Sequence, residues 1–333
     1  MHVPVWVWLA TVAGIAALFV FDFYAHVRKP HDPTFREAAW WSVFFVALAA
    51  VFGGGLWWVW GAQHGAEYFA GFITEKSLSV DNLFVFLIIM TKFAVPRAYQ
   101  QKALLIGIVI ALILRGIFIA VGAAAIAQFS WIFYLFGLFL LYTAIQLVRE
   151  GTGGHDENEE YEPNAMVRWI QKRLPATDEF DQDRLFTVKN GKRLATPLMM
   201  VVVALGMTDV LFALDSIPAI YGLTKEPYIV FTTNAFALLG LLQLYFLLGG
   251  LLARLVYLSL GLSFILAFIG VKLIVEAMHT NNLPFINGGE PLHLVPEIPI
   301  WLSMTIILGT LVITTVASLI KSRNLSREPS RQH

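Results

Sequence analysis

Long apolar blocks, rather than an alternating pattern, constrain the fold of this chain more than any other feature. Hydrophobic residues make up 58% of its 333 residues and charged residues 14%, whereas a soluble domain carries about 25% charged residues. About 20 consecutive apolar residues cross the hydrocarbon core of a bilayer as a helix. The sequence therefore predicts an all-α polytopic membrane protein with about nine transmembrane helices. Their expected ranges are 4–24, 38–60, 66–91, 103–126, 129–148, 197–221, 228–252, 255–278 and 298–320.

The distribution of basic residues predicts how the chain is oriented. With the N-terminus outside, the segments expected in the cytoplasm hold nineteen Lys and Arg residues, and the outside loops hold only Lys225. Cytoplasmic loops of membrane proteins carry such an excess of basic residues. We therefore expect the N-terminus outside and the C-terminus inside. The block 4–24 has no basic region before it and no convincing cleavage site after it, which favours a retained helix over a signal peptide.

Two of the predicted spans carry the same acidic spacing. Glu75 and Asp81 are separated by five residues, and so are Asp209 and Asp215, at an offset of 134 residues. An ionised carboxylate inside hydrocarbon is costly, so it is rarely kept for packing alone. Two copies of one acidic pattern indicate a site that handles a cation.

Each acidic helix begins a predicted three-helix unit, 66–148 and 197–278. Because each unit has an odd number of spans, the second must enter the membrane from the opposite side, which makes an inverted repeat unless the similarity arose by chance. Transporters built in this way bind substrate near the bilayer midplane, between the repeats. The other predicted segments are an N-terminal pair of helices at 1–65, a cytoplasmic loop at 149–196, and 279–333, which holds an outside loop, the last helix and a cytoplasmic tail.

The predicted loop 149–196 contains two distinct patterns. Its acidic run HDENEEYEP is typical of a solvated linker. Further on, Asn190-Gly191 lies between short β-prone flanks, which predicts a hairpin with a type I′ turn. Neither pattern indicates a role in sensing metal.

The residues of the acidic spans favour a hard divalent cation. Carboxylate, amide and hydroxyl oxygens suit Mn²⁺, Mg²⁺ or Ca²⁺. The chain has no Cys, and no His lies in an acidic span, so Zn²⁺ and Cu⁺ are disfavoured. Four carboxylates exceed the need of one divalent ion, and we expect some to take up protons when the ion leaves, as in proton-for-metal antiport. The candidate ligands are Glu75, Asp81, Asp209 and Asp215, with Asn82 and Asn234 as neutral oxygens.

Helix geometry limits how these acids can act together. Residues i and i+6 lie about 120° apart around a regular helix and about 9 Å apart along it. Either a helix unwinds locally, which Gly206 and Pro218 favour near the second pair, or each helix offers its acids at different depths. Arg115 also lies within a span, and we interpret it either as a fixed counter-charge for the acidic site or as a structurally paired residue. Lys76 projects away from Glu75 and is expected to reach an interface.

Several strings in these spans resemble the TerC family of integral membrane proteins. They are EKSLSVDNLFVF, FALDSIPAI and NAFALLG, together with the segment from NGKRLATP onward. The resemblance covers about residues 35–320 and comes closest to the Alx-type manganese exporters. It implies a multi-pass protein of the bacterial inner membrane that exports Mn²⁺. The residues that the resemblance places on the metal pathway are Glu75, Asp81, Asp209 and Asp215, with Asn82 and Asn234 as companions.

The chain departs from its relatives at two positions. They usually have an arginine where this chain has Leu242, the position that matches Arg115 in the other repeat. They also often have an acid where this chain has Ala253. A symmetric role for two arginines is therefore not expected here, and either departure could alter coupling or ion preference.

The leading interpretation is a secondary transporter that exports divalent metal, with Mn²⁺ as cargo and protons as the counter-ion. The alternative is an accessory membrane protein that supplies metal to exported proteins or to a membrane complex. An enzyme is disfavoured, because the spans hold no Ser–His pair or His-rich motif and the Gly-rich context of an intramembrane aspartyl protease is absent around Asp209. The formal net charge of +0 predicts no nucleic-acid partner. We expect no cofactor, and either a monomer or a homodimer in the bilayer.

Overall fold

The computed structural model describes most of the chain. The residues outside the description are 28–32, 130, 153–176, 178, 190–191, 249–256, 282, 284–285, 293–295, 297 and 326–333. A few side chains within helices, among them that of Asp81, also lie outside it.

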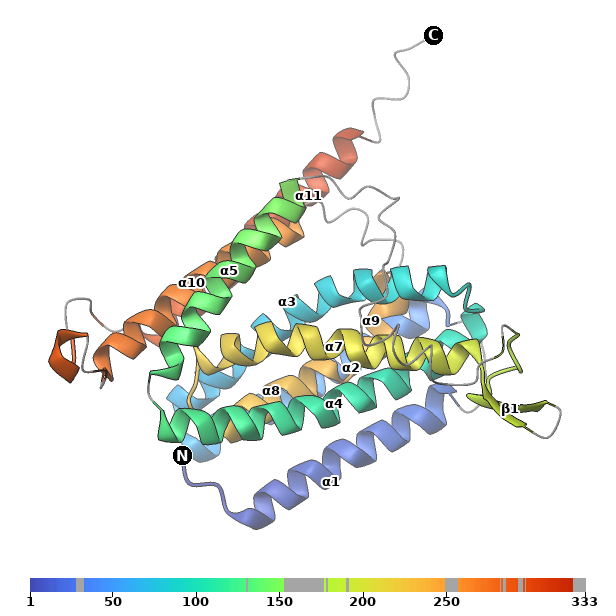
Figure 1. Ribbon diagram of the computed structural model, residues 1–333, viewed down its shortest axis with the longest axis horizontal. Helices are drawn as coiled ribbons and strands as arrows, with labels where there is room; N and C mark the ends of the chain where they lie inside the picture. The colour runs from blue at the N-terminus through green and yellow to red at the C-terminus, as the bar shows by residue number, and fades with distance from the viewer. Residues whose placement is uncertain are drawn as a thin grey trace, which may run out of the picture.

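The described residues form long helices and one small hairpin (Figure 1). The first five helices are α1 (Val5–Asp22), continued by the π-helical turn η1 (Phe23–Val27), α2 (Phe35–Trp60), α3 (Ala62–Lys92), α4 (Arg97–Gln128) and α5 (Ile132–Thr152). The strands β1 (Phe186–Lys189) and β2 (Lys192–Ala195) follow. The later helices are α7 (Pro197–Tyr221), α8 (Pro227–Leu238), α9 (Leu241–Leu248), α10 (Leu258–His279), the short η3 (Asn287–Gly289) and α11 (Ile300–Leu325).

The length and composition of the helices confirm an all-α polytopic membrane protein. Within the described residues, eight helical stretches are long and apolar enough to cross a bilayer. The helix α3 has 31 residues but carries several charged side chains, so it is less apolar than the other eight. The predicted orientation, with the N-terminus outside, is not tested by this arrangement and stays a prediction.

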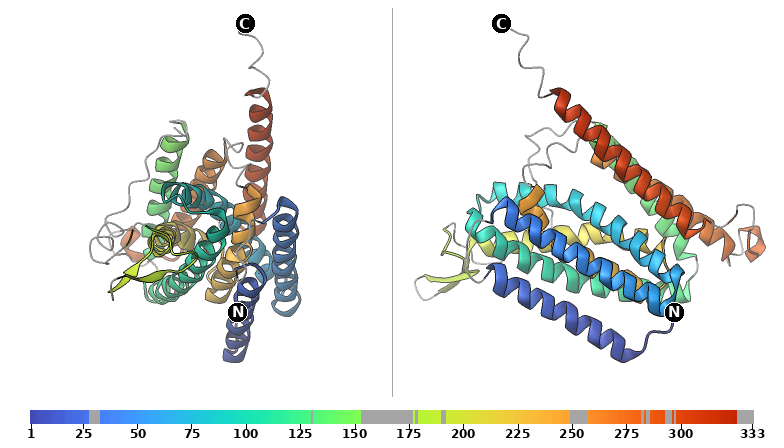
Figure 2. Two further views of the ribbon diagram at one scale, coloured as in Figure 1. Left: turned by 90° about the vertical axis from the view of Figure 1, so that its right-hand side faces the viewer. Right: turned by 180° about the vertical axis from the view of Figure 1, so that it is seen from behind.

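The helices of the two predicted repeats pack against one another. The helix α3 packs on α7 and α8, α4 packs on the same two helices, and α5 runs along α10. Glycines allow the last contact, since a Cβ at Gly137 would lie 2.7 Å from the carbonyl oxygen of Gly270. Figures 1 and 2 show α5, α10 and α11 together as an arm that crosses the main bundle obliquely, whereas α1 and α2 flank α8 and α9. The division of the chain into five segments stays a prediction.

One predicted span is broken. The sequence predicts a continuous helix over 228–252, but α8 ends at Leu238 and α9 starts at Leu241. Gly240 has φ of +75°, a left-handed conformation that glycine adopts readily. A Cβ there would also lie 2.9 Å from the Cβ of Phe45 on α2, so the glycine permits both the turn and the close approach. The predicted span is therefore present over Pro227–Leu247 but its helix is interrupted at Gly240, and its last residues, 249–252, lie outside the described part.

The two strands of the hairpin expected around Asn190-Gly191 are present. Residues Phe186 and Ala195 are partners at one end of the antiparallel pair β1–β2. The turn itself and the acidic run lie outside the described residues. Lys102 of α4 anchors the segment before the hairpin, with its Nζ 2.8 Å from Asp183 Oδ2, and this hydrogen bond lowers the pKa of the Asp183 carboxyl.

Candidate cation site

A fully buried arginine lies at the centre of the bundle. Arg115 projects from the middle of α4, and its side chain is 0% exposed. Its Nε donates a hydrogen bond to Asp209 Oδ2 at 2.8 Å, and its Nη2 donates to Asp209 Oδ1 at 3.0 Å. Its Nη1 forms an ion pair with Glu75 Oε1. Two carboxylates from the two predicted repeats therefore bind one guanidinium.

Two neutral side chains complete the arginine's surroundings. Arg115 Nη1 also donates to Ser216 Oγ at 3.2 Å and to Asn234 Oδ1 at 2.9 Å. Asn234 in turn donates from Nδ2 to the carbonyl of Val230, one turn earlier in α8, which fixes the direction of its amide. We call Arg115, Glu75, Asp209, Ser216 and Asn234 the Arg115 cluster.

The Arg115 cluster joins four helices and has an excess of acid. Its carboxylates come from α3 and α7, its guanidinium from α4 and its amide from α8. With both carboxylates ionised it holds one more negative charge than positive. Glu75 Oε2 is buried and has no hydrogen-bond partner among the described groups. A cation held at this place would find carboxylate, amide and hydroxyl oxygens, which are the ligands that hard divalent ions prefer.

Two other predicted site residues, Asp215 and Asn82, lie apart from the Arg115 cluster. Asp215 and Asn82 line a cavity of about 280 Å³ between α3, α5, α7 and α10. Thr143 of α5 donates a hydrogen bond to Asp215 Oδ1 at 3.4 Å, and Gln146 also lines the cavity. The side chain of Asp81 is outside the description. Among the described residues, no three His, Asp or Glu side chains gather as a metal-binding group.

The structure distinguishes between the two arrangements predicted for the acids. Both α3 and α7 are continuous helices, so neither unwinds between its carboxylates. Pro218 lies inside α7 without ending it. The local unwinding that Gly206 and Pro218 favour is therefore not seen between Asp209 and Asp215, and α7 presents these two acids to different surroundings. The interrupted helix is the one that carries Asn234.

Lys76 does not reach an interface as the sequence analysis expected. Its Nζ donates to the carbonyl oxygen of Ala237 at 2.9 Å and to that of Leu239 at 3.4 Å. Both carbonyls lie where α8 ends, and the last carbonyls of a helix lack partners within it. A lysine placed there satisfies these acceptors and the negative end of the helix dipole.

Two further buried polar groups were missed by the sequence analysis. Asp22 lies 2.8 Å from Nδ1 of His26, one turn on, and accepts a hydrogen bond from Gln243 at 3.4 Å. Glu67 accepts a hydrogen bond from Thr224 at 2.7 Å. Both acids are buried, at 2% and 7% exposure respectively. Their nearby histidines, in DFYAH and HGAE, were the available signal.

The two positions that the family resemblance singled out fall in different places. Leu242 is buried in α9 at 1% exposure, so the predicted second repeat has an apolar side chain at the position that matches Arg115. Ala253 lies outside the described residues.

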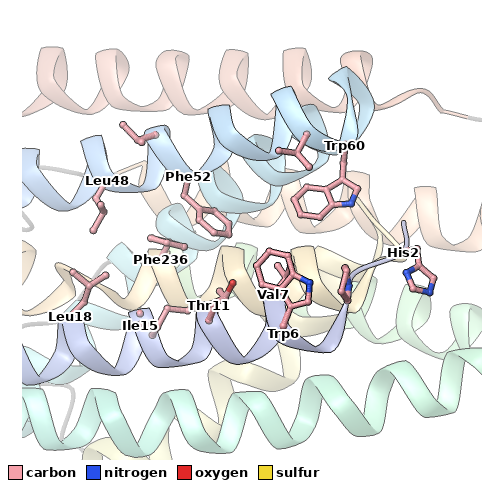
Figure 3. A pocket seen from close by; sticks show the side chains of 15 residues that line it. His2, Trp6, Val7, Thr11, Ile15, Leu18, Leu48, Phe52, Trp60 and Phe236 are labelled. Carbon is pink, nitrogen blue, oxygen red and sulfur yellow. The ribbon is translucent and has the colours of Figure 1, made fainter.

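A larger hollow lies between α1 and α2, but its chemistry is different. It has a volume of about 900 Å³, and Figure 3 shows mostly apolar side chains around it, such as Ile15, Leu48 and Phe52. No carboxylate lines it. This hollow therefore offers no group of acidic ligands for a cation.

The break between α8 and α9 gives a direct test of the central architecture. We expect Gly240→Ala to lower the stability of the folded protein, by about 1–2 kcal/mol from the left-handed backbone alone and by more because of the contact with Phe45. Denaturant unfolding of the purified protein in detergent measures the change. Gly309→Ala in α11 is the matched control, since a Cβ there meets nothing within 4 Å. Equal unfolding midpoints for the two variants would contradict the requirement for a residue without a side chain at position 240.

The long apolar helices, the broken span and the buried charges between packed helices define a multi-pass integral membrane protein with a polar centre. The sequence matches the profile of the Integral membrane protein TerC family over residues 60–326. The chain belongs to the TerC family. No solved structure matches this chain.

The similar proteins are membrane proteins of bacteria. An "Uncharacterized membrane protein" of Mycobacterium tuberculosis (strain ATCC 25618 / H37Rv) is 50% identical over 317 residues, which cover 95% of this chain and 80% of that protein. An "Uncharacterized membrane protein" of Myxococcus xanthus is 40% identical over 317 residues, with 95% and 93% covered. The "Putative membrane-bound redox modulator Alx" of Escherichia coli (strain K12) is 37% identical over 319 residues, with 93% and 92% covered.

Proposed function

We propose that this chain is a secondary transporter that exports a divalent metal ion, Mn²⁺, across the bacterial inner membrane by alternating access, with protons as the counter-ion. The observation that carries the proposal is the fully buried guanidinium of Arg115 between Glu75 and Asp209. Charged side chains within a membrane are expensive and mark ion pathways. Two carboxylates that bind the guanidinium of the protein's own arginine also have the chemistry to bind a metal cation.

In the proposed cycle, Mn²⁺ competes with Arg115 for the carboxylates. Glu75 has an unpartnered oxygen, Oε2, and Asn234 and Ser216 offer neutral oxygens beside it. When the metal binds, the guanidinium must move aside, because two cations at one place repel each other. When the metal leaves, Arg115 returns and keeps the carboxylates compensated. The returning guanidinium thus lets the empty transporter reorient without unpaired acids.

The cavity beside Asp215 is the proposed second stage of the pathway. Asp215, Asn82 and Thr143 give it oxygen ligands, and it lies between helices of both predicted repeats. A carboxylate that lines such a cavity can exchange a metal ion for a proton. We therefore propose proton uptake at Asp215 and, through the repeat, at Asp81.

A second function is suggested by the name of the Alx relatives. A redox role could not pass through a thiol of this chain, which has no Cys. An accessory protein that supplies metal to exported proteins or to a membrane complex would use the same ligands without net flux, and it could affect redox chemistry through the metal. This second candidate predicts Mn²⁺ binding but requires a partner for its activity.

The test uses purified protein in proteoliposomes, with Mn²⁺ flux and internal pH recorded together. We expect saturable Mn²⁺ flux with opposing proton movement, reduced at least tenfold in Asp81→Asn and Asp215→Asn. Asp183→Asn is the matched control, since that carboxylate pairs with Lys102 near the hairpin and away from both sites. Unchanged flux in the first two variants would overturn the acidic pathway. Mn²⁺ binding without flux in the wild type would favour the accessory role.

A further inference from the structure

Lys76 contacts the broken helix at the point where its hydrogen bonding stops. It lies in the middle of α3, and its two hydrogen bonds go to backbone carbonyls, those of Ala237 and Leu239. Among the described residues Lys76 forms no ion pair, so its hydrogen-bond partners there are these two carbonyl oxygens. In transporters with discontinuous helices, carbonyls at the C-terminal end of a half-helix serve as cation ligands. Here the cation is a side chain of the protein itself.

The same half-helix also closes the Arg115 cluster. Asn234 lies three residues before Ala237, about one turn before the end of α8, and its Oδ1 accepts the hydrogen bond from Arg115 at 2.9 Å. Glu75 and Lys76 are neighbours on α3, and they reach Arg115 and the end of α8 respectively. Two cations therefore contact α8, Arg115 through Asn234 and Lys76 through the terminal carbonyls.

We propose that Lys76 is a positioning residue that holds the end of α8 so that Asn234 closes the Arg115 cluster against the transported metal. Release of the ammonium from Ala237 and Leu239 frees α8 to turn at Gly240. Asn234 then releases Arg115, and its Oδ1 becomes available to the divalent cation beside the unpartnered oxygen of Glu75. Lys76 thus sets the balance between a closed and a metal-binding centre. This inference rests on the proposed transport function.

The first test compares Mn²⁺ binding and transport in Lys76→Met with the wild type. The variant loses the contact that favours the closed state of the Arg115 cluster. We therefore expect the Mn²⁺ dissociation constant, measured by calorimetry, to fall at least about fivefold, which is within the usual range for coupling between two sites. In proteoliposomes, KM and the maximal rate should both fall, since a centre that cannot close again releases metal slowly. A residue needed only for stability would lower the amount of folded protein and leave the dissociation constant unchanged. That result would overturn the proposal.

Lys272→Met is the matched control. Lys272 is another lysine within a membrane helix, but its Nζ donates to Ser303 Oγ at 3.2 Å and contacts no carbonyl of the broken helix in the described residues. We expect wild-type Mn²⁺ affinity in this variant. If Lys76→Met does not fold, Lys76→Gln keeps a hydrogen-bond donor without the charge and should show the same change in a weaker form. Failure of both variants to fold would assign Lys76 to stability alone and overturn the proposal.

A second readout separates this proposal from the transport function. The chain has no natural Cys, so Thr233→Cys, on α8 beside Asn234 and 0% exposed, provides a single thiol. We expect a small maleimide to label it at least fivefold faster when Lys76→Met is added, without any metal present. Faster labelling in a protein that binds no Mn²⁺ would leave Lys76 as a positioning residue and reject the metal substrate. Equal labelling rates would reject the role of Lys76 whatever the transport result.

Discussion

Replacing Arg115 with methionine is expected to have the largest effect on stability of any single substitution in this protein. The change leaves Glu75 and Asp209 buried in the bilayer-spanning bundle without a counter-charge. Removal of one partner from a buried ion pair costs about 3–5 kcal/mol, which is a large share of the stability of most domains. We expect little folded protein in membranes, measured by detergent extraction and size-exclusion chromatography. Unlike an ordinary destabilised variant, it should be rescued by Mn²⁺, because a divalent cation can take the place of the guanidinium.

Two comparisons make the expectation for Arg115 specific. Arg184→Met removes a solvent-exposed arginine that lies 3.6 Å from Asp181, and exposed pairs contribute about 0–1 kcal/mol, so this variant should fold normally. The triple variant Arg115→Met, Glu75→Gln, Asp209→Asn removes all three charges and should recover folded protein without Mn²⁺. Recovery would attribute the loss to unpaired carboxylates. Normal folding of Arg115→Met alone, with no added metal, would contradict an ionised Glu75–Arg115–Asp209 group.

The sequence predicted the residues of the central cluster better than it predicted their geometry. Ionisable residues in a span are costly, so Glu75, Asp209 and Arg115 were identifiable one by one. The offset of 134 residues also matched Glu75 with Asp209, and these two carboxylates do bind the same arginine. Composition and block length were enough for the all-α membrane fold, since a bilayer permits few alternatives to a helix.

The parts that the sequence did not predict depend on neighbours that it cannot specify. The spacing of Asp209 and Asp215 gives the angle between them on α7, but not which helix faces each one. Gly240 lies within an apolar run, and the sequence does not show that Phe45 of α2 comes so close that a side chain at 240 would clash with it. Lys76 was expected at an interface because it projects away from Glu75. The helix end that it contacts instead exists only because the span 228–252 is interrupted, which the sequence did not reveal.

The second large effect concerns the two carboxylates that bind Arg115, which the sequence treats as equivalent and the structure does not. Asp209 binds the guanidinium through both oxygens, at 2.8 and 3.0 Å. Glu75 binds through Oε1, and its Oε2 has no partner among the described groups. Bidentate pairs are the stronger and more rigid ones. Asp209 therefore holds Arg115 in place, whereas Glu75 has an oxygen to offer a metal ion.

Opposite outcomes are expected when each acid is replaced by its amide. Asp209→Asn breaks the bidentate pair and should lower the free energy of unfolding by about 3 kcal/mol, in the range for a disrupted buried pair. Glu75→Gln leaves Arg115 paired with Asp209 and removes the excess negative charge, so we expect unfolding close to that of the wild type but Mn²⁺ affinity reduced about 100-fold, near 2.7 kcal/mol. Denaturant unfolding and calorimetric titration with Mn²⁺ measure the two quantities on the same preparations. Equal losses of stability in the two variants would contradict the division of roles, and unchanged Mn²⁺ affinity in Glu75→Gln would remove Glu75 from the metal site. Because both substitutions are nearly isosteric, a difference between them reports on the asymmetric bonding of Arg115 and not on side-chain size.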